Sequence, residues 1–140
     1  MICASVCPTC RRHATWTWTA RRDSRLATIP IGYADGVDRG LSNNMQAMIS
    51  VSDSDNINGV NNNNVRLIKQ AGRISMDQML FDITDVPEAQ EGDVITLIGE
   101  SGQTSINLSQ WAESLATITY ELACRLRARL PRVYTRSRLK

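Results

Sequence analysis

The spacing of apolar residues changes once along this chain, and that change restricts the fold more than any other feature. Between residues 25 and 99, short apolar segments recur, separated by turn-forming stretches such as GYADG and DVPEAQEGD. After residue 104 the apolar residues follow a helical period, at Leu108, Trp111, Ala112 and Leu115. The pattern predicts a mainly β fold, a small barrel or sandwich, with one or two short helices near its C-terminal end.

The individual elements can be placed approximately. Apolar, β-branched segments predict strands over 25–31, 45–51, 64–74, 79–83 and 94–99, and Pro131 ends the helical region before a last strand over 130–134. Ser105 or Asn107 is expected to cap the first helix, and Leu122 belongs to a second one. The Asn-rich stretch 52–64 predicts an exposed hairpin loop. We expect an atypical segment over 1–16 followed by one domain over 17–140.

Charge and hydropathy exclude several classes of protein. Twelve of the sixteen basic residues lie in two end blocks, but the net charge is only +2 and no aromatic residue lies between Arg125 and Arg129 for base stacking. Cations also suit a helix C-terminus, so we predict no nucleic-acid partner. The chain has no apolar run long enough for a membrane span and no signal-peptide pattern at its start. We therefore expect a reducing, cytoplasmic setting with free cysteines and no membrane partner.

The first thirteen residues carry a possible metal-ligand pattern. Cys3, Cys7 and Cys10 have the spacing C-x3-C-x2-C, and His13 follows three residues later. Three thiolates with His13 or Cys124 could hold zinc, and the spacing also occurs at iron–sulfur clusters. Structural zinc usually needs two such paired knuckles, however, and only one C-x2-C is present. We predict no metal site, and keep a metal-binding or protein-interaction module as the alternative function.

Residues suited to acid–base chemistry are few. The chain has one histidine, and its only lysines are Lys69, within a predicted strand, and the terminal Lys140. No P-loop, nucleophile elbow or dinucleotide fingerprint occurs. Taken separately, the polar and aromatic residues of GYADGVDR, GRISMDQ and TITYELAC are compatible with purely structural roles.

Three stretches in the same order nevertheless resemble one family. RLATIPIGYADGVDRGLSN, AGRISMDQMLFDITDVPEAQEGDVITLIG and TITYELACRLRARLPRVY resemble the C-terminal domain of alanine racemases, over about Thr17 to Tyr134. These enzymes use pyridoxal phosphate (PLP) to interconvert L- and D-alanine and so supply D-alanine for peptidoglycan. Serine racemases linked to glycopeptide resistance share the domain, so the parent substrate stays open between alanine and serine.

The resemblance implies an architecture and a set of partners. It implies a β domain that follows an N-terminal barrel, and the barrel carries the Schiff-base lysine and most PLP contacts. It also implies a head-to-tail homodimer in which this domain of one subunit covers the active-site mouth of the other. The residues implied to bind the small amino-acid substrate are Tyr33 along the corridor, Arg73 toward its opening, Met76 near the substrate, and Arg39, which matches an arginine of the family a few residues after Tyr33. Tyr120 is implied to contact the PLP phosphate.

The chain departs from the family in two respects. The barrel with its PLP lysine is absent from these 140 residues. The family's catalytic tyrosine is expected near Arg12–Ala14: counting back nineteen residues from Tyr33 gives Ala14, and matching the letters ATW gives Arg12. No tyrosine precedes Tyr33, and an arginine stays protonated and cannot act as a base. We therefore predict no catalytic residue, no PLP binding by this chain alone, and an inactive domain or fragment of a racemase.

Overall fold

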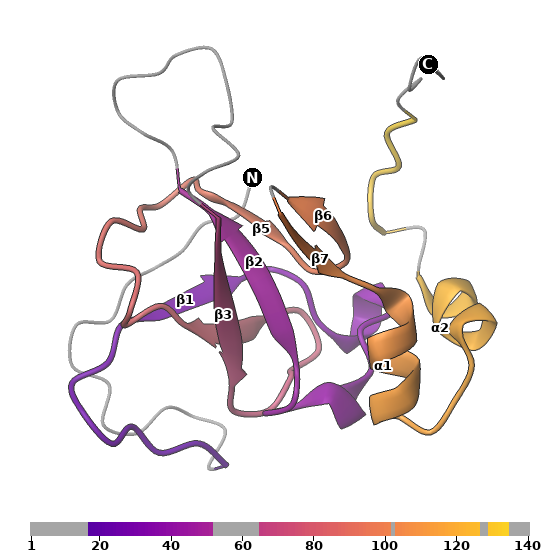
Figure 1. Cartoon of the computed structure of the whole chain (residues 1–140). Helices are drawn as coiled ribbons and strands as arrows, with labels where there is room; N and C mark the ends of the chain where they lie inside the picture. Colours follow the sequence, from indigo (N-terminus) through magenta and orange to yellow (C-terminus); the bar gives the residue numbers. More distant parts are fainter. Residues whose placement is uncertain (1–16, 52–64, 102, 127–128, 135–140) are drawn as a thin grey trace.

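The computed structural model describes residues 17–51, 65–101, 103–126 and 129–134, which form a curled antiparallel sheet, a small hairpin and two short helices (Figure 1). The sheet has five strands in the order β1-β4-β3-β2-β5. Their bounds are β1 Leu26–Ile29, β4 Met79–Asp82, β3 Val65–Ala71, β2 Gln46–Ser50 and β5 Val94–Thr96. The mainly β fold predicted from the sequence is confirmed, as are these five strands, each shorter than its apolar segment.

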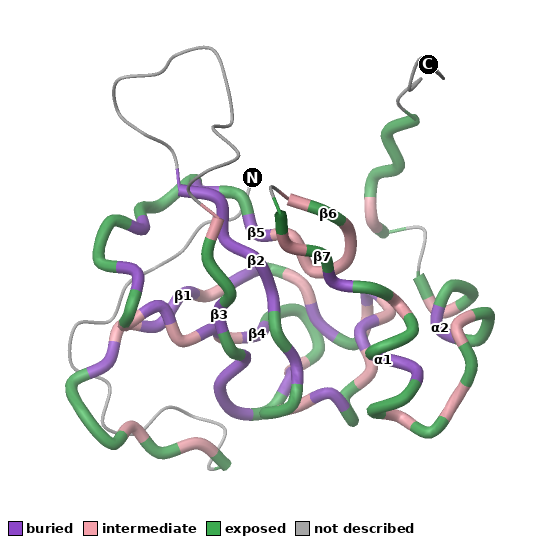
Figure 2. Tube along the Cα trace, viewed as in Figure 1, coloured by how far each residue is buried: buried purple, intermediate pink, exposed green. Residues whose placement is uncertain are grey.

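The sheet curls around a core of aliphatic side chains and one phenylalanine. Phe81 in β4 and Ile29 in β1 are fully buried, and Figure 2 shows most of β1 and β2 buried as well. In β4 buried and half-buried residues alternate, because successive side chains of a strand point to opposite faces. Pairing in register, such as Ala27 with Phe81 and Ala47 with Ile68, brings the buried faces of neighbouring strands together.

Two helices follow the sheet, as the change of period predicts. Helix α1 spans Leu108–Ser114, and Asn107 precedes it as the N-cap, with its backbone N–H donating to the Gln110 side chain at 3.0 Å. Trp111 and Ala112 of α1 are buried against the core. Helix α2, Thr119–Arg125, adds Leu122 to the same core while most of its other residues are exposed (Figure 2).

The structure differs from the sequence-based expectation in two elements. The hairpin of β6 Gly99–Ser101 and β7 Thr104–Ile106 was not predicted, because strands of three residues carry almost no periodic signal. The strand predicted over 130–134 is wrong: these residues are irregular, Pro131 has no N–H to donate, and Val133 and Tyr134 are exposed. The predicted segment 1–16 and loop 52–64 lie outside the described residues. Within the described part of the chain, no helix is both long enough and apolar enough to cross a membrane.

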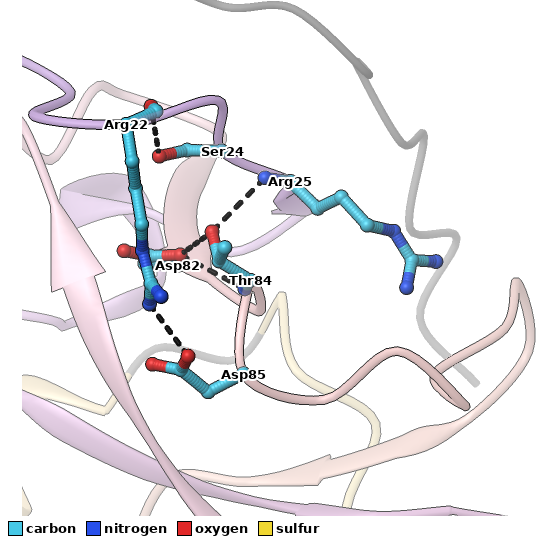
Figure 3. A network of polar contacts seen from close by, with 6 residues as sticks. All are labelled: Arg22, Ser24, Arg25, Asp82, Thr84 and Asp85. Carbon is cyan, nitrogen blue, oxygen red and sulfur yellow. Dashed lines mark hydrogen bonds and ion pairs between the residues drawn. The ribbon is translucent and has the colours of Figure 1, made fainter.

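A polar network fixes the segment that leads into β1 (Figure 3). The Arg25 N–H donates to Thr84 Oγ1 at 3.0 Å, and Arg22 Nη2 lies 2.6 Å from Asp85 Oδ1. The Arg25 guanidinium points away from Asp85 and donates to three backbone carbonyl oxygens beyond β4, those of Val86, Pro87 and Ala89, at 3.3, 2.7 and 3.0 Å. Arg25 therefore holds the connector after β4 against the start of β1.

Replacing Arg25 with methionine is expected to lower the free energy of unfolding by about 2 kcal/mol, because three carbonyl groups lose a charged donor. The matched change Arg22→Met, which breaks only a solvent-exposed ion pair, should change stability little. Urea unfolding followed by tryptophan fluorescence compares the two. Equal losses in both variants would contradict the role given to Arg25.

Candidate functional site

Three segments that are far apart in the sequence meet at one place, which we call the junction. It consists of the turn Gly32–Asp38, the loop Ser75–Asp77, and α2 together with Arg129. The turn contains a short 3-10 helix, η1 Tyr33–Asp35. The Tyr33 N–H donates to the Ser75 carbonyl at 3.1 Å, and the Ala34 N–H donates to the Met76 carbonyl at 3.0 Å. The turn and the loop are therefore joined backbone to backbone.

The two glycines of GYADG explain why the turn fits between its neighbours. A Cβ atom on Gly32 would lie 2.3 Å from the Ser75 carbonyl oxygen, so a side chain there would push the loop away. Gly36 has a φ of +112°, and a Cβ atom on it would lie 2.4 Å from the Arg125 carbonyl oxygen at the end of α2. One glycine thus permits contact with the loop and the other permits contact with α2.

Ion pairs connect α2 to the same turn. Asp38, the N-cap of the second 3-10 helix η2 Arg39–Leu41, accepts from the Gly40 N–H at 2.7 Å and pairs with Arg125 Nη1. Arg125 Nη2 also lies 2.6 Å from Glu121 Oε1. A hydrogen bond from the Thr117 hydroxyl, and then the Arg125 guanidinium, lower the pKa of Glu121. Arg125 therefore holds the C-terminal end of α2 at the turn.

Tyr33 and Met76, two of the predicted substrate-binding residues, lie on adjoining segments of the junction. Their segments share the backbone hydrogen bonds described above, and the two side chains are 46% and 53% exposed. Tyr120 is 78% exposed in the first turn of α2, whereas Gly36 and Asp38 approach Arg125, at the other end of that helix. Among the described residues, no hydrogen bond or ion pair links Tyr120 to Tyr33 or Met76.

The other two predicted residues, Arg39 and Arg73, lie on neighbouring segments. The Ser42 hydroxyl donates to the Arg39 carbonyl at 2.6 Å and accepts from the Ile74 N–H at 3.1 Å, so it links η2 to the residue after Arg73. Both arginines are exposed, and within the described ranges neither guanidinium has a carboxylate partner. Two such guanidinium groups can attract and bind a carboxylate by paired, charge-assisted hydrogen bonds.

Sequence reasoning noted the charges at the junction but missed their pairing. Asp35 and Asp38 in the turn face Arg129 and Arg125, and Asp77 in the loop also pairs with Arg129. The signal in the sequence was the pair of acids in GYADGVD, three residues apart, and the three arginines of CRLRAR, two residues apart. That spacing alone does not say that the two segments meet.

The described residues do not build a metal centre or a complete PLP site. Cys3, Cys7, Cys10 and His13 lie outside the described residues, which leaves the metal hypothesis untested. In the ranges that are described, no three His, Cys, Asp or Glu side chains are grouped to hold a metal ion. Lys69, the one lysine in those ranges, lies in central strand β3 between β2 and β4, and no contact joins it to Tyr120. The residues present therefore do not fit PLP without a further protein surface.

The family model, the relatives and the solved structures given below all point to the same family. The family model "Alanine racemase, C-terminal domain" matches residues 15–134. The alanine racemase of a Nostoc species is 41% identical over 114 residues, which are 81% of this chain and 26% of that protein. The biosynthetic alanine racemase of Pseudomonas aeruginosa has a similar structure, with a TM-score of 0.75 and 29% identity over 96% of this chain and 34% of that one. The Bartonella henselae alanine racemase, solved with covalently bound pyridoxal phosphate, gives a TM-score of 0.73 at 29% identity, over 96% of this chain and 33% of that one. The chain spans about a quarter of the length of the curated relatives it matches.

Proposed function

The chain belongs to the alanine racemase family, as its C-terminal domain, and we propose that it covers the mouth of a racemase active site rather than catalysing alone. The observation that carries the proposal is the junction, in which the turn that carries Tyr33 and the loop that carries Met76 are hydrogen-bonded backbone to backbone while both side chains are exposed. The family resemblance implies that Tyr33 lines the substrate corridor and that Met76 lies near the substrate. A covering domain needs such a rigid pair, because a corridor wall discriminates between substrates only if it holds its position.

The surface around α2 supports a protein partner for this domain. Five large apolar side chains from the described C-terminal part of the chain are exposed, one before α2, one in it and three after it: Ile118, Tyr120, Leu126, Val133 and Tyr134. Covering such side chains with another protein is favourable, because it removes apolar area from water. The matched relatives are about four times as long as the matched region, which supports a barrel domain as that partner. We propose contact with the barrel of a racemase, in the same subunit or in the partner subunit of a homodimer.

The proposal also assigns residues of this domain to the substrate and to the cofactor. Arg39 and Arg73 attract the carboxylate of a small amino acid, alanine in the first place, toward Tyr33 and Met76. Covalent pyridoxal phosphate is a property of the Bartonella enzyme. We place the cofactor and its lysine on the barrel, and assign to Tyr120 the donation of a phenol hydroxyl to the cofactor phosphate.

The purified chain, supplied with PLP and L-alanine, is expected to form no D-alanine above a blank without protein. The reason is that neither a PLP lysine nor the family's tyrosine is present in a suitable place. Chiral chromatography measures the product, and the full-length Nostoc enzyme serves as the positive control. D-alanine formation that rises in proportion to the concentration of this chain would refute a purely covering role.

A further inference from the structure

One arginine lies between the two loops that carry Tyr33 and Met76. Arg129 Nε is 3.3 Å from Asp35 Oδ1 in the turn, and Arg129 Nη2 is 2.8 Å from Asp77 Oδ1 in the loop. Asp35 is two residues after Tyr33, and Asp77 directly follows Met76. A single guanidinium therefore contacts both segments, and each of its two carboxylate partners lies within two residues of a predicted substrate-binding residue.

The two carboxylates that Arg129 contacts differ in burial, so the contact is more than an ion pair at the surface. The Asp35 side chain is only 6% exposed, and its second oxygen Oδ2 accepts the Gly32 N–H at 2.9 Å. That hydrogen bond fixes Asp35 within the turn, so the orientation of the carboxylate is set before Arg129 binds it. The Asp77 side chain is 59% exposed and lies on the loop that the turn contacts.

Without a cation between them, the two carboxylates would oppose the close contact of turn and loop. Two like charges on adjacent loops repel, and the repulsion is greater for a buried group such as Asp35 than for one in water. A planar guanidinium can use Nε for one carboxylate and Nη2 for the other, which an ammonium group cannot do in the same geometry.

We propose that Arg129 is a positioning residue that clamps Asp35 to Asp77 and thereby fixes Tyr33 against Met76. Its ion pairs go to Asp35 and Asp77, so it acts on Tyr33 and Met76 through the two loops. The link from this clamp to substrate binding rests on the proposed function, but the clamp itself does not.

The test uses the full chain and amide hydrogen exchange measured by NMR. Arg129→Ala should speed exchange of the Tyr33 and Ala34 amides by at least about tenfold, with less than about a twofold change in β2 and β3. Arg129→Lys should give an intermediate rate. Arg132→Ala is the matched control and should leave both amides unchanged, because among the described residues Arg132 donates to the Leu126 carbonyl, at 3.3 Å, and to neither loop.

Asp77→Asn removes one arm of the clamp at an exposed position, so it remains informative if Arg129→Ala does not fold. It should speed exchange of the same two amides. Unchanged exchange at Tyr33 and Ala34, or equal acceleration throughout β3, would overturn the clamp. These measurements need no racemase activity, so they decide the role of Arg129 even if the proposed function fails.

A second readout tests whether the clamp matters for substrate. It uses a graft in which residues 17–134 of this chain replace the C-terminal domain of the Nostoc enzyme. Arg129→Ala in the graft should lower kcat/KM by about tenfold, because misplaced corridor residues orient the substrate poorly. Arg129→Lys should restore part of that loss and Arg132→Ala should cause none. An unchanged kcat/KM in Arg129→Ala would overturn the link from clamp to substrate.

Discussion

Replacing Gly36 with alanine is expected to lower the free energy of unfolding by about 3 kcal/mol, a large effect for adding one methyl group. Two causes combine. The φ of +112° is strained for any residue with a side chain, and the new Cβ would lie 2.4 Å from the Arg125 carbonyl oxygen. Because that oxygen belongs to the backbone at the end of α2, it cannot turn aside as a flexible side chain can.

Gly92→Ala is the matched control for this change. Gly92 has a similar φ of +101°, but a Cβ atom there would have no atom within 4 Å. Its substitution should cost about 1 kcal/mol, from backbone strain alone. Urea unfolding of both variants measures the difference, which reports the contact between turn and helix. Equal losses in Gly36→Ala and Gly92→Ala would show that α2 does not press on the turn.

The sequence predicts the strands and helices of this fold better than it predicts which of them contact one another. Strands such as β4 and helix α1 carry their own periodic signal, and Asn107, one of the two caps that the sequence predicts, is the N-cap of α1. The hairpin β6–β7 is too short to carry such a signal. Residues 130–134 contain β-forming Val133 and Tyr134, but a strand also needs a partner edge, which no local pattern can supply.

The candidate site shows the same limit. The resemblance to a family indicated Tyr33, Arg39, Arg73, Met76 and Tyr120, but not which of them lie together. Arg129 pairs with Asp35 across 94 residues of sequence, and this contact depends on the docking of α2. Likewise, the glycines of GYADG predict a turn, whereas the close approach of Gly32 to the Ser75 carbonyl is visible only in the folded chain.

The tyrosine missing from the segment before β1 is expected to have the largest effect on the rate of racemisation. A graft that also carries residues 11–16 of this chain should racemise alanine about a thousandfold more slowly than one that keeps the Nostoc residues there, because a general base of this kind contributes about 10²–10⁴-fold. The protonated guanidinium of an arginine cannot replace it.

Two single substitutions in the slower graft distinguish the two possible positions of the lost tyrosine. If the alignment that matches the letters ATW is right, Arg12→Tyr should recover much of the rate. If the alignment that counts back nineteen residues from Tyr33 is right, Ala14→Tyr should do so instead. Steady-state formation of D-alanine measures both variants. Two results would contradict the account of a missing base. One is that neither substitution raises the rate, and the other is that the graft with residues 11–16 of this chain racemises alanine as fast as the graft with the Nostoc residues.

The most direct test of the central claim is D-alanine formation by the graft that keeps the Nostoc barrel and tyrosine and takes residues 17–134 from this chain. If this domain is a competent cover for a racemase site, the purified, PLP-loaded graft should form D-alanine well above the blank, and Arg132→Ala should not reduce the rate. A folded, PLP-loaded graft that forms no D-alanine above the blank would contradict the claim.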